Sequence, residues 1–132
     1  MIKHKLDEIR KKWGIKPRPF MYILEKGEPV PCDDTMEWGK FMEDSDRILA
    51  RATIERDGVA TMISTVFLAV DHSFCMEGPP ILWETMVFQN DKACNAFTQR
   101  YANAEQAIAG HNFVFSEVIR RLDMGEDLRK DT

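Results

Sequence analysis

The sequence has no apolar run that approaches the roughly 20 residues of a membrane-spanning helix. It has only three cysteines in 132 residues, and none of them forms a Cys-x-x-Cys unit. Three thiols cannot all pair with one another, so we expect reduced cysteines in a cytoplasmic protein. Charged residues occupy the N-terminal segment, where a secretory signal needs an apolar run. The sequence therefore predicts neither export nor membrane contact.

Several signatures of catalysis are also missing. The chain has no glycine-rich phosphate loop, no Gly-x-Ser-x-Gly elbow and no His-Glu-x-x-His motif. His72 and Cys75 have half of a zinc-type spacing, but no second pair of such ligands follows at a suitable distance. P-loop, serine hydrolase and zincin mechanisms are therefore poorly supported, and we expect neither a metal nor a cofactor.

The bulk composition predicts one globular domain over residues 1–132. A hydrophobic fraction of 44% and a charged fraction of 30% are ordinary for a folded protein of this size. The net charge of −4 makes general nucleic-acid binding unlikely, but residues 1–20 hold seven Lys or Arg and only two acids. This basic segment could contact a partner or nucleic acid, and docking on its own acidic body is the favoured alternative. A homodimer is one arrangement that the sequence allows.

Periodicity divides the chain into a helix and linker (residues 1–19), a core (20–122) and a frayed tail (123–132). The apolar residues of the first helix recur at offsets of four, three and four: Ile2, Leu6, Ile9 and Trp13. Residues 20–24 read as a strand that ends in a Lys26-Gly27 turn. Asp34 or Thr35 then opens a short second helix.

The clearest structural signal is a hairpin over residues 47–70. Asp57-Gly58 lies between two β-type runs and is typical of a two-residue turn. On the predicted core face, the turn gives the pairs Arg56–Val59, Ile54–Thr61, Ala52–Ile63, Ala50–Thr65 and Ile48–Phe67. Residues 81–88 form the next strand. Residues 91–102 fit a helix or an edge strand, and the pattern does not decide between them.

A long helix is predicted from Asn103, a good N-cap residue with Gln106 three positions later, to about Leu122. Its core stripe is expected to consist of Ala104, Ile108, His111, Phe115, Val118 and Leu122. Together these elements predict an α+β fold. An antiparallel sheet of three to five strands carries the long C-terminal helix on one face, with short N-terminal helices.

The candidate site follows the hairpin, where a loop and a strand place polar residues beside apolar runs. Its candidate binding residues are Asp71, His72, Cys75, Glu77, Trp83, Glu84 and His111. Asp71, His72, Glu84 and His111 are expected to form one polar cluster that joins loop, sheet and helix. The same cluster is the candidate for a ligand pocket.

Glu84 is the most informative of these residues because its strand is otherwise apolar. A buried carboxylate without a partner is costly or takes up a proton, so Glu84 needs a partner. The candidates are His72, His111, Arg51 and Arg100. A Glu84–histidine pair could perform general acid–base catalysis, although structural pairing of such residues is more common.

His111 follows Gly110 in the middle of the predicted helix, where glycine is tolerated if another part of the chain approaches closely. A core histidine with a single hydrogen-bond partner is the favoured interpretation, and a functional histidine facing a carboxylate is the alternative. We assign no catalytic residue and keep Glu84, His72 and His111 as candidates.

Three segments resemble a family of small uncharacterised proteins of bacteriophages and prophages: TVFLAVDHSF from Thr65, GPPILWETMVF from Gly78 and RYANAEQAIAGH from Arg100. The resemblance covers about residues 47–118 and implies a viral origin and the host cytoplasm, but no activity. The favoured function is a non-catalytic accessory protein that binds a host protein or a small ligand through the loop at residues 71–80. A small hydrolase or nucleotide-processing enzyme is one alternative. A ligand-sequestering protein that uses the same pocket is the other.

Overall fold

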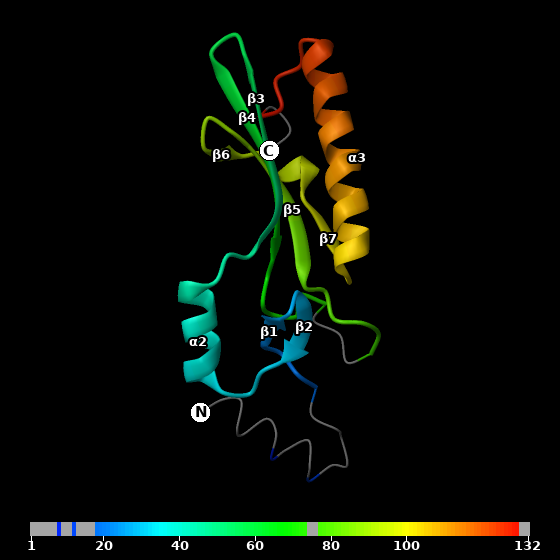
Figure 1. Cartoon of the computed structure of the whole chain (residues 1–132). Helices are drawn as coiled ribbons and strands as arrows, with labels where there is room; N and C mark the ends of the chain where they lie inside the picture. Colours follow the sequence, from blue (N-terminus) through cyan, green and yellow to red (C-terminus); the bar gives the residue numbers. More distant parts are fainter. Residues whose placement is uncertain (1–7, 9–11, 13–17, 74–76, 130–132) are drawn as a thin grey trace.

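The computed structural model describes residues 8, 12, 18–73 and 77–129 and has the predicted α+β fold. Its main sheet is antiparallel and five-stranded, in the order β3-β4-β5-β6, with β7 paired to β5. The strands are β3 (Ile48–Arg56), β4 (Val59–Phe67), β5 (Trp83–Gln89), β6 (Lys92–Ala93) and β7 (Gln99–Tyr101). The long helix α3 (Ala104–Asp123) covers one face of this sheet (Figure 1).

The predicted hairpin is β3 and β4. Asp57 and Gly58 have φ values of 53° and 78°, so both central residues of the turn adopt the left-handed conformation of a type I′ turn. The predicted pairs from Arg56–Val59 to Ala50–Thr65 are confirmed. The last predicted pair is wrong: a bulge between Ile48 and Ala50 places Ile48 opposite Val66 instead of Phe67.

The described N-terminal part forms a second, smaller unit at one end of the main sheet (Figure 1). Strands β1 (Tyr22–Glu25) and β2 (Glu28–Pro31) pair across the predicted Lys26-Gly27 turn. Helix α2 (Thr35–Asp44) begins after Asp34, whose carboxylate accepts hydrogen bonds from the backbone N–H groups of Met36 and Glu37. Among the described residues this is one short helix, not several. The helix predicted at residues 2–13 lies outside them, apart from Glu8 and Lys12.

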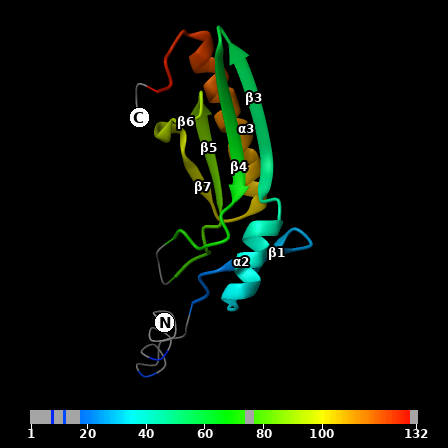
Figure 2. The same ribbon diagram turned by 90° about the vertical axis from the view of Figure 1, so that its left-hand side faces the viewer.

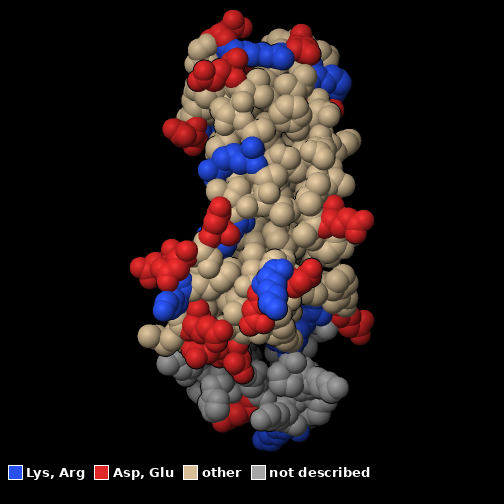
Figure 3. Space-filling model, viewed as in Figure 1, with Lys and Arg blue, Asp and Glu red and all other residues tan. Residues whose placement is uncertain are grey.

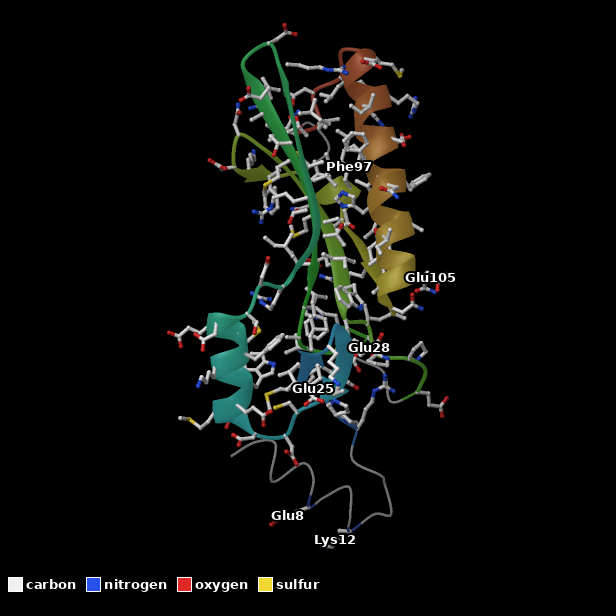
Figure 4. All side chains as sticks on the ribbon, viewed as in Figure 1. Glu8, Lys12, Glu25, Glu28, Phe97 and Glu105 are labelled. Atoms are coloured by element: carbon white, nitrogen blue, oxygen red, sulfur yellow. The ribbon has the colours of Figure 1, made fainter. Side chains whose placement is uncertain are left out.

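Residues 91–102 form neither one helix nor one continuous edge strand, although their last part is a short strand. They form β6, a 3₁₀ turn η1 (Asn95–Phe97) and β7 in succession. β7 returns to pair with β5, which places Tyr101 opposite Trp83 and Arg100 opposite Glu84. Phe97 lies between the sheet and α3 (Figure 4), where its ring is 5.5 Å from the Arg121 guanidinium carbon.

Helix α3 begins as predicted, because the Asn103 side chain accepts a hydrogen bond from the Gln106 N–H at 2.8 Å. Its buried stripe is rotated about the helix axis relative to the predicted stripe. The buried residues are Ala107, His111, Val114 and Val118, whereas Ile108 is 49% exposed. The sheet therefore lies against a helix face that includes the small Ala107, and the larger Ile108 lies at its margin.

The described part of the C-terminal tail, up to Arg129, is docked, contrary to the prediction of a frayed end. Gly125 has a φ of 76° and donates to Leu122 O, while the Glu126 N–H bonds Arg121 O. This is a Schellman cap, which turns the chain back on itself. Leu128 consequently returns to the core cluster of Ile63, Val87 and Val118, where it is 2% exposed.

Candidate functional site

The sheet separates Glu84 from His111, one of the two histidines that the sequence suggested as its acid–base partner. Successive side chains of a strand point to opposite faces. Thr85 of β5 points toward α3, since its hydroxyl contacts Thr65, which in turn bonds His111 of that helix. Its neighbour Glu84 therefore points away from α3. Glu84 and His111 therefore do not pair, and this one of the predicted alternatives is wrong.

Glu84 instead pairs with Arg100 on the neighbouring strand β7. The Arg100 Nε donates to Glu84 Oε2 at 2.8 Å, and the Glu84 side chain is 11% exposed against 49% for Arg100. Arg100 was one of four partners that the sequence allowed. The contact follows from register, because Glu84 and Arg100 are direct cross-strand neighbours.

His111 belongs to a buried network of hydroxyl groups between the sheet and α3. Thr65 Oγ1 lies 2.7 Å from His111 Nδ1 and 2.6 Å from Thr85 Oγ1. Tyr101 donates from its hydroxyl to Thr85 Oγ1 at 3.0 Å. Thr65 and Thr85 are fully buried, and His111 is 7% exposed.

One arrangement of protons lets every hydroxyl of this network donate once. Tyr101 donates to Thr85, Thr85 to Thr65, and Thr65 to His111 Nδ1, which leaves the histidine proton on Nε2. This chain needs a neutral imidazole, and burial lowers the pKa of His111 in agreement with it. Burial also raises the pKa of Tyr101, against the effect of its bond to Thr85.

Tyr101 also explains the glycine inside α3. A Cβ atom placed on Gly110 would lie 2.2 Å from the Tyr101 ring, far inside van der Waals contact. The glycine thus admits an aromatic ring of β7 against the helix. The sequence indicated a close approach at Gly110, but the ring that makes it came from the segment whose structure was undecided.

Asp71 clamps the start of its loop, and it is 5% exposed. Its carboxylate accepts hydrogen bonds from the backbone N–H of Ser73 at 2.8 Å and of Ile81 at 3.0 Å, and from Arg18 Nε at 3.1 Å. Burial raises the pKa of this carboxyl, but the hydrogen bonds from Ile81, Ser73 and Arg18 outweigh burial and the net pKa is lowered. The loop ends are therefore held together by an ionised side chain.

The remaining predicted site residues take separate positions. His72 is half-buried, and its Nδ1–H donates to Val70 O at 3.1 Å, since a carbonyl oxygen can only accept. Trp83 is a core residue whose ring packs 5.0 Å from that of Phe67. Glu77 is exposed, and Cys75 lies outside the described residues.

The face of the sheet that α3 covers is polar at alternate cross-strand pairs. Thr61 faces Gln89 and Thr65 faces Thr85, while the intervening pairs are apolar: Ile63 with Val87 and Phe67 with Trp83. All eight side chains are buried, and Gln89 donates to Thr61 Oγ1 at 3.1 Å. Half of this helix-covered face therefore consists of amide and hydroxyl side chains.

The opposite face, here called the open face, carries apolar side chains on the same two strands. It comprises Arg51, Thr53 and Glu55 of β3, Met62, Ser64 and Val66 of β4, and Glu84, Met86 and Phe88 of β5. Met62, Val66, Met86 and Phe88 are half-buried. In the view onto this face, α3 lies behind the sheet and α2 lies below it (Figure 2). Within the described residues, no helix covers the open face.

Charge is distributed unevenly beside this face. In the orientation of Figure 1, acidic side chains gather on and around α2, and the middle of the molecule is mainly uncharged (Figure 3). The acids of the α2 region are Asp33, Asp34, Glu37, Glu43, Asp44 and Asp46. On the open face itself, the charged residues are Arg51 and Glu55 of β3 and Glu84 of β5, which pairs with Arg100.

Comparison of the chain with protein families, curated proteins and solved structures gives no match. Among the described residues, no group of three or more His, Cys, Asp and Glu side chains is placed to hold a metal ion. None of the described helices is long and apolar enough to cross a membrane.

The sequence interpretation missed the hydroxyl partners and the open face. Thr65 and Thr85 resembled ordinary strand residues, and only their shared face with His111 gives them a role. The apolar open face had a sequence signal, because Met62, Met86 and Phe88 alternate with residues assigned to the core. That alternation predicts strands that are apolar on both sides.

Proposed function

We propose that the protein acts by binding another protein through the open face of its sheet. The observation that carries the proposal is the apolar character of this face on β4 and β5, where Met62, Val66, Met86 and Phe88 have no helix above them in the described chain. An antiparallel sheet with one free face normally directs polar side chains to the solvent. An apolar free face is typical of a surface that a partner covers.

The composition of the face fits a protein partner. The face combines four apolar side chains, two of them methionines and one aromatic, with the Glu84–Arg100 pair, and Val66 lies directly opposite Glu84. Protein interfaces combine such an apolar centre with a few charged groups, and methionine, phenylalanine and arginine are enriched there. Methionine adapts its shape readily, which suits a contact surface without a rigid pocket.

The alternatives that use a Glu84–histidine pair have less support. A general base must be free to reach a proton of the substrate. Glu84 is engaged by Arg100, Asp71 by Arg18 and two backbone N–H groups, and His111 by Thr65. These contacts favour structural roles for the three residues.

The resemblance to small bacteriophage proteins leads us to propose that the partner is a bacterial host protein and that binding occurs in the host cytoplasm.

The test is recovery of partners by immobilised protein from bacterial extract. The variant Met86→Glu places a charge in the centre of the open face, and Met36→Glu is its matched control because Met36 is 82% exposed on α2. We expect a protein that is retained by the wild type and by Met36→Glu and that binds Met86→Glu at least tenfold more weakly when its affinity is measured. Equal affinity for all three forms would contradict the proposal.

A second variant separates binding from catalysis. Glu84→Gln keeps the shape of the side chain but removes its charge, and we expect partner affinity to change only severalfold. If extract components were chemically converted by the wild type and not by Glu84→Gln, the enzyme alternative would replace the binding proposal.

A further inference from the structure

The outer edge of β3 is a regular strand edge without a partner in the described chain. β3 stands at the end of the strand order, pairs with β4 alone and contains no proline. Unpaired strand edges of this length are sites of pairing with another chain unless they are shortened, bulged or blocked. The bulge of β3 lies at its first residues, so the stretch from Arg51 to Glu55 keeps a regular register.

The turn geometry shows which backbone groups point outward. In a two-residue hairpin, Arg56 and Val59 form a hydrogen-bonded pair, and such pairs alternate with pairs that do not bond each other. Glu55, Thr53 and Arg51 therefore direct their N–H and C=O groups away from β4. Ala60, the cross-strand neighbour of Glu55, likewise directs its carbonyl away from β3, because that carbonyl accepts a hydrogen bond from the Asn90 N–H.

The side chains along this edge are complementary to themselves. Arg51 and Glu55 flank Thr53 at equal spacing, all three lie on the open face, and all three are exposed. No described residue forms an ion pair with Arg51 or Glu55. If two β3 strands pair antiparallel about Thr53, each Arg51 faces the Glu55 of the other copy. The adjacent allowed register on one side places Arg51 opposite Thr53, and the one on the other side places it opposite Asp57 of the turn, after the end of β3, so both lose the match within the strands.

The other side of the edge is apolar. Arg56 of β3 forms an ion pair with Asp123 of α3, which identifies the flank of the helix nearest β3. Helical spacing places Ile119, Phe115 and Ile108 along that flank. Ile108 is 49% exposed, and Phe115 and Ile119 are half-buried. A second helix arriving beside this flank would cover them.

We propose that two copies of the chain pair through β3, antiparallel and centred on Thr53, to form one continuous sheet. Three residues of each copy direct backbone groups to the edge, so the pairing supplies about six backbone hydrogen bonds. Two Arg51–Glu55 ion pairs lie on the open side, and the α3 flanks meet on the other. The proposal does not depend on the partner discussed above, and it joins two open faces into one surface.

The mass of the purified protein in solution tests the proposal through light scattering and sedimentation over a range of concentrations. We expect a monomer–dimer equilibrium for the wild type. Arg51→Glu replaces two attractions with two repulsions and should raise the dimer dissociation constant about tenfold or more. The double variant Arg51→Glu/Glu55→Arg restores opposite charges and should restore the dimer. Lys92→Glu, a charge reversal on β6, is the matched control and should leave it unchanged.

Thr53→Pro tests the backbone part separately. The N–H of Thr53 points outward, so proline removes a dimer contact without removing a β3–β4 bond. We expect a folded monomer, checked by circular dichroism. A wild type that is monomeric at every concentration would overturn the proposal, as would a dimer that Arg51→Glu and Thr53→Pro both leave intact. Met86→Glu should keep the dimer, so failure of the open-face proposal is distinguishable from failure of this one.

Discussion

On β4 and β5, the face under α3 contains buried polar pairs and the open face carries exposed apolar area, although the free face of a sheet is normally the polar one. The face under α3 alternates apolar pairs with Thr61–Gln89 and Thr65–Thr85, whereas the open face carries Met62, Val66, Met86 and Phe88. In the covered face, polar atoms are buried at the cost of desolvation and are compensated by hydrogen bonds to one another. In the open face, apolar area remains in water. The difference indicates that hydrophobicity alone does not decide which face of a strand a helix covers.

The largest expected effect is a contrast between phenylalanines on the two faces. Phe67→Ala removes a fully buried ring that packs on Phe41 and Trp83, and it should lower the free energy of unfolding by about 4 kcal/mol. Phe88→Ala on the half-buried open face should cost about 1 kcal/mol. Urea denaturation of both variants measures the difference. Equal losses would mean that the open face is part of the core.

A second contrast compares two glycines in helices. Gly110→Ala drives a methyl group into the Tyr101 ring and should cost about 2 kcal/mol of unfolding free energy. Gly39→Ala on α2 meets no atom within 4 Å and should stabilise the protein by up to about 1 kcal/mol. Thermal and urea unfolding measure both. A stabilising Gly110→Ala would show that Tyr101 does not pack there.

The third contrast concerns threonines on the two faces. Thr65→Val deprives both His111 Nδ1 and Thr85 of a partner, and it should lower the free energy of unfolding by about 1.5 kcal/mol. Thr53→Val on the exposed edge of the open face should change it by less than about 0.5 kcal/mol. The same urea titration serves both variants. Equal effects of the two substitutions on the free energy of unfolding would contradict a stabilising role of the hydroxyl network on the covered face.

The smallest effect is a pH dependence that belongs to the covered face. Burial lowers the pKa of His111 below its ordinary value of 6.5, so the unfolded chain takes up the proton first as the pH falls. The contribution of His111 to stability should be fully present well above pH 6.5 and should be lost progressively as the pH falls below 6.5. His111→Gln should flatten this decrease, and His72→Gln should not. Asp71, whose pKa is lowered from 3.8, affects only more acidic solutions. A wild-type profile that stays flat between pH 7.5 and 5 would contradict a neutral buried His111.

Much of the local structure could be predicted because the signals are short-range. Asp57-Gly58 has the residues that a type I′ turn requires, Asn103 and Asp34 cap their helices with their own side chains, and each decision involves neighbours in the chain. The candidate site was predicted only in part. Arg100 was one of four possible partners of Glu84, but the choice depended on pairing β5 with β7, a segment whose own type the sequence left open.

The sequence by itself determined the α+β class, the hairpin with most of its register, and the beginning of both described helices. Tertiary structure decided which face of the sheet α3 covers, and thereby separated Glu84 from His111. It also decided the rotation of α3 about its own axis, which buries Ala107 and exposes Ile108, and the return of Leu128 to the core. The physical reason is the same in each case. Turns and caps bond backbone groups a few residues apart, whereas faces are chosen by packing between segments far apart in the chain.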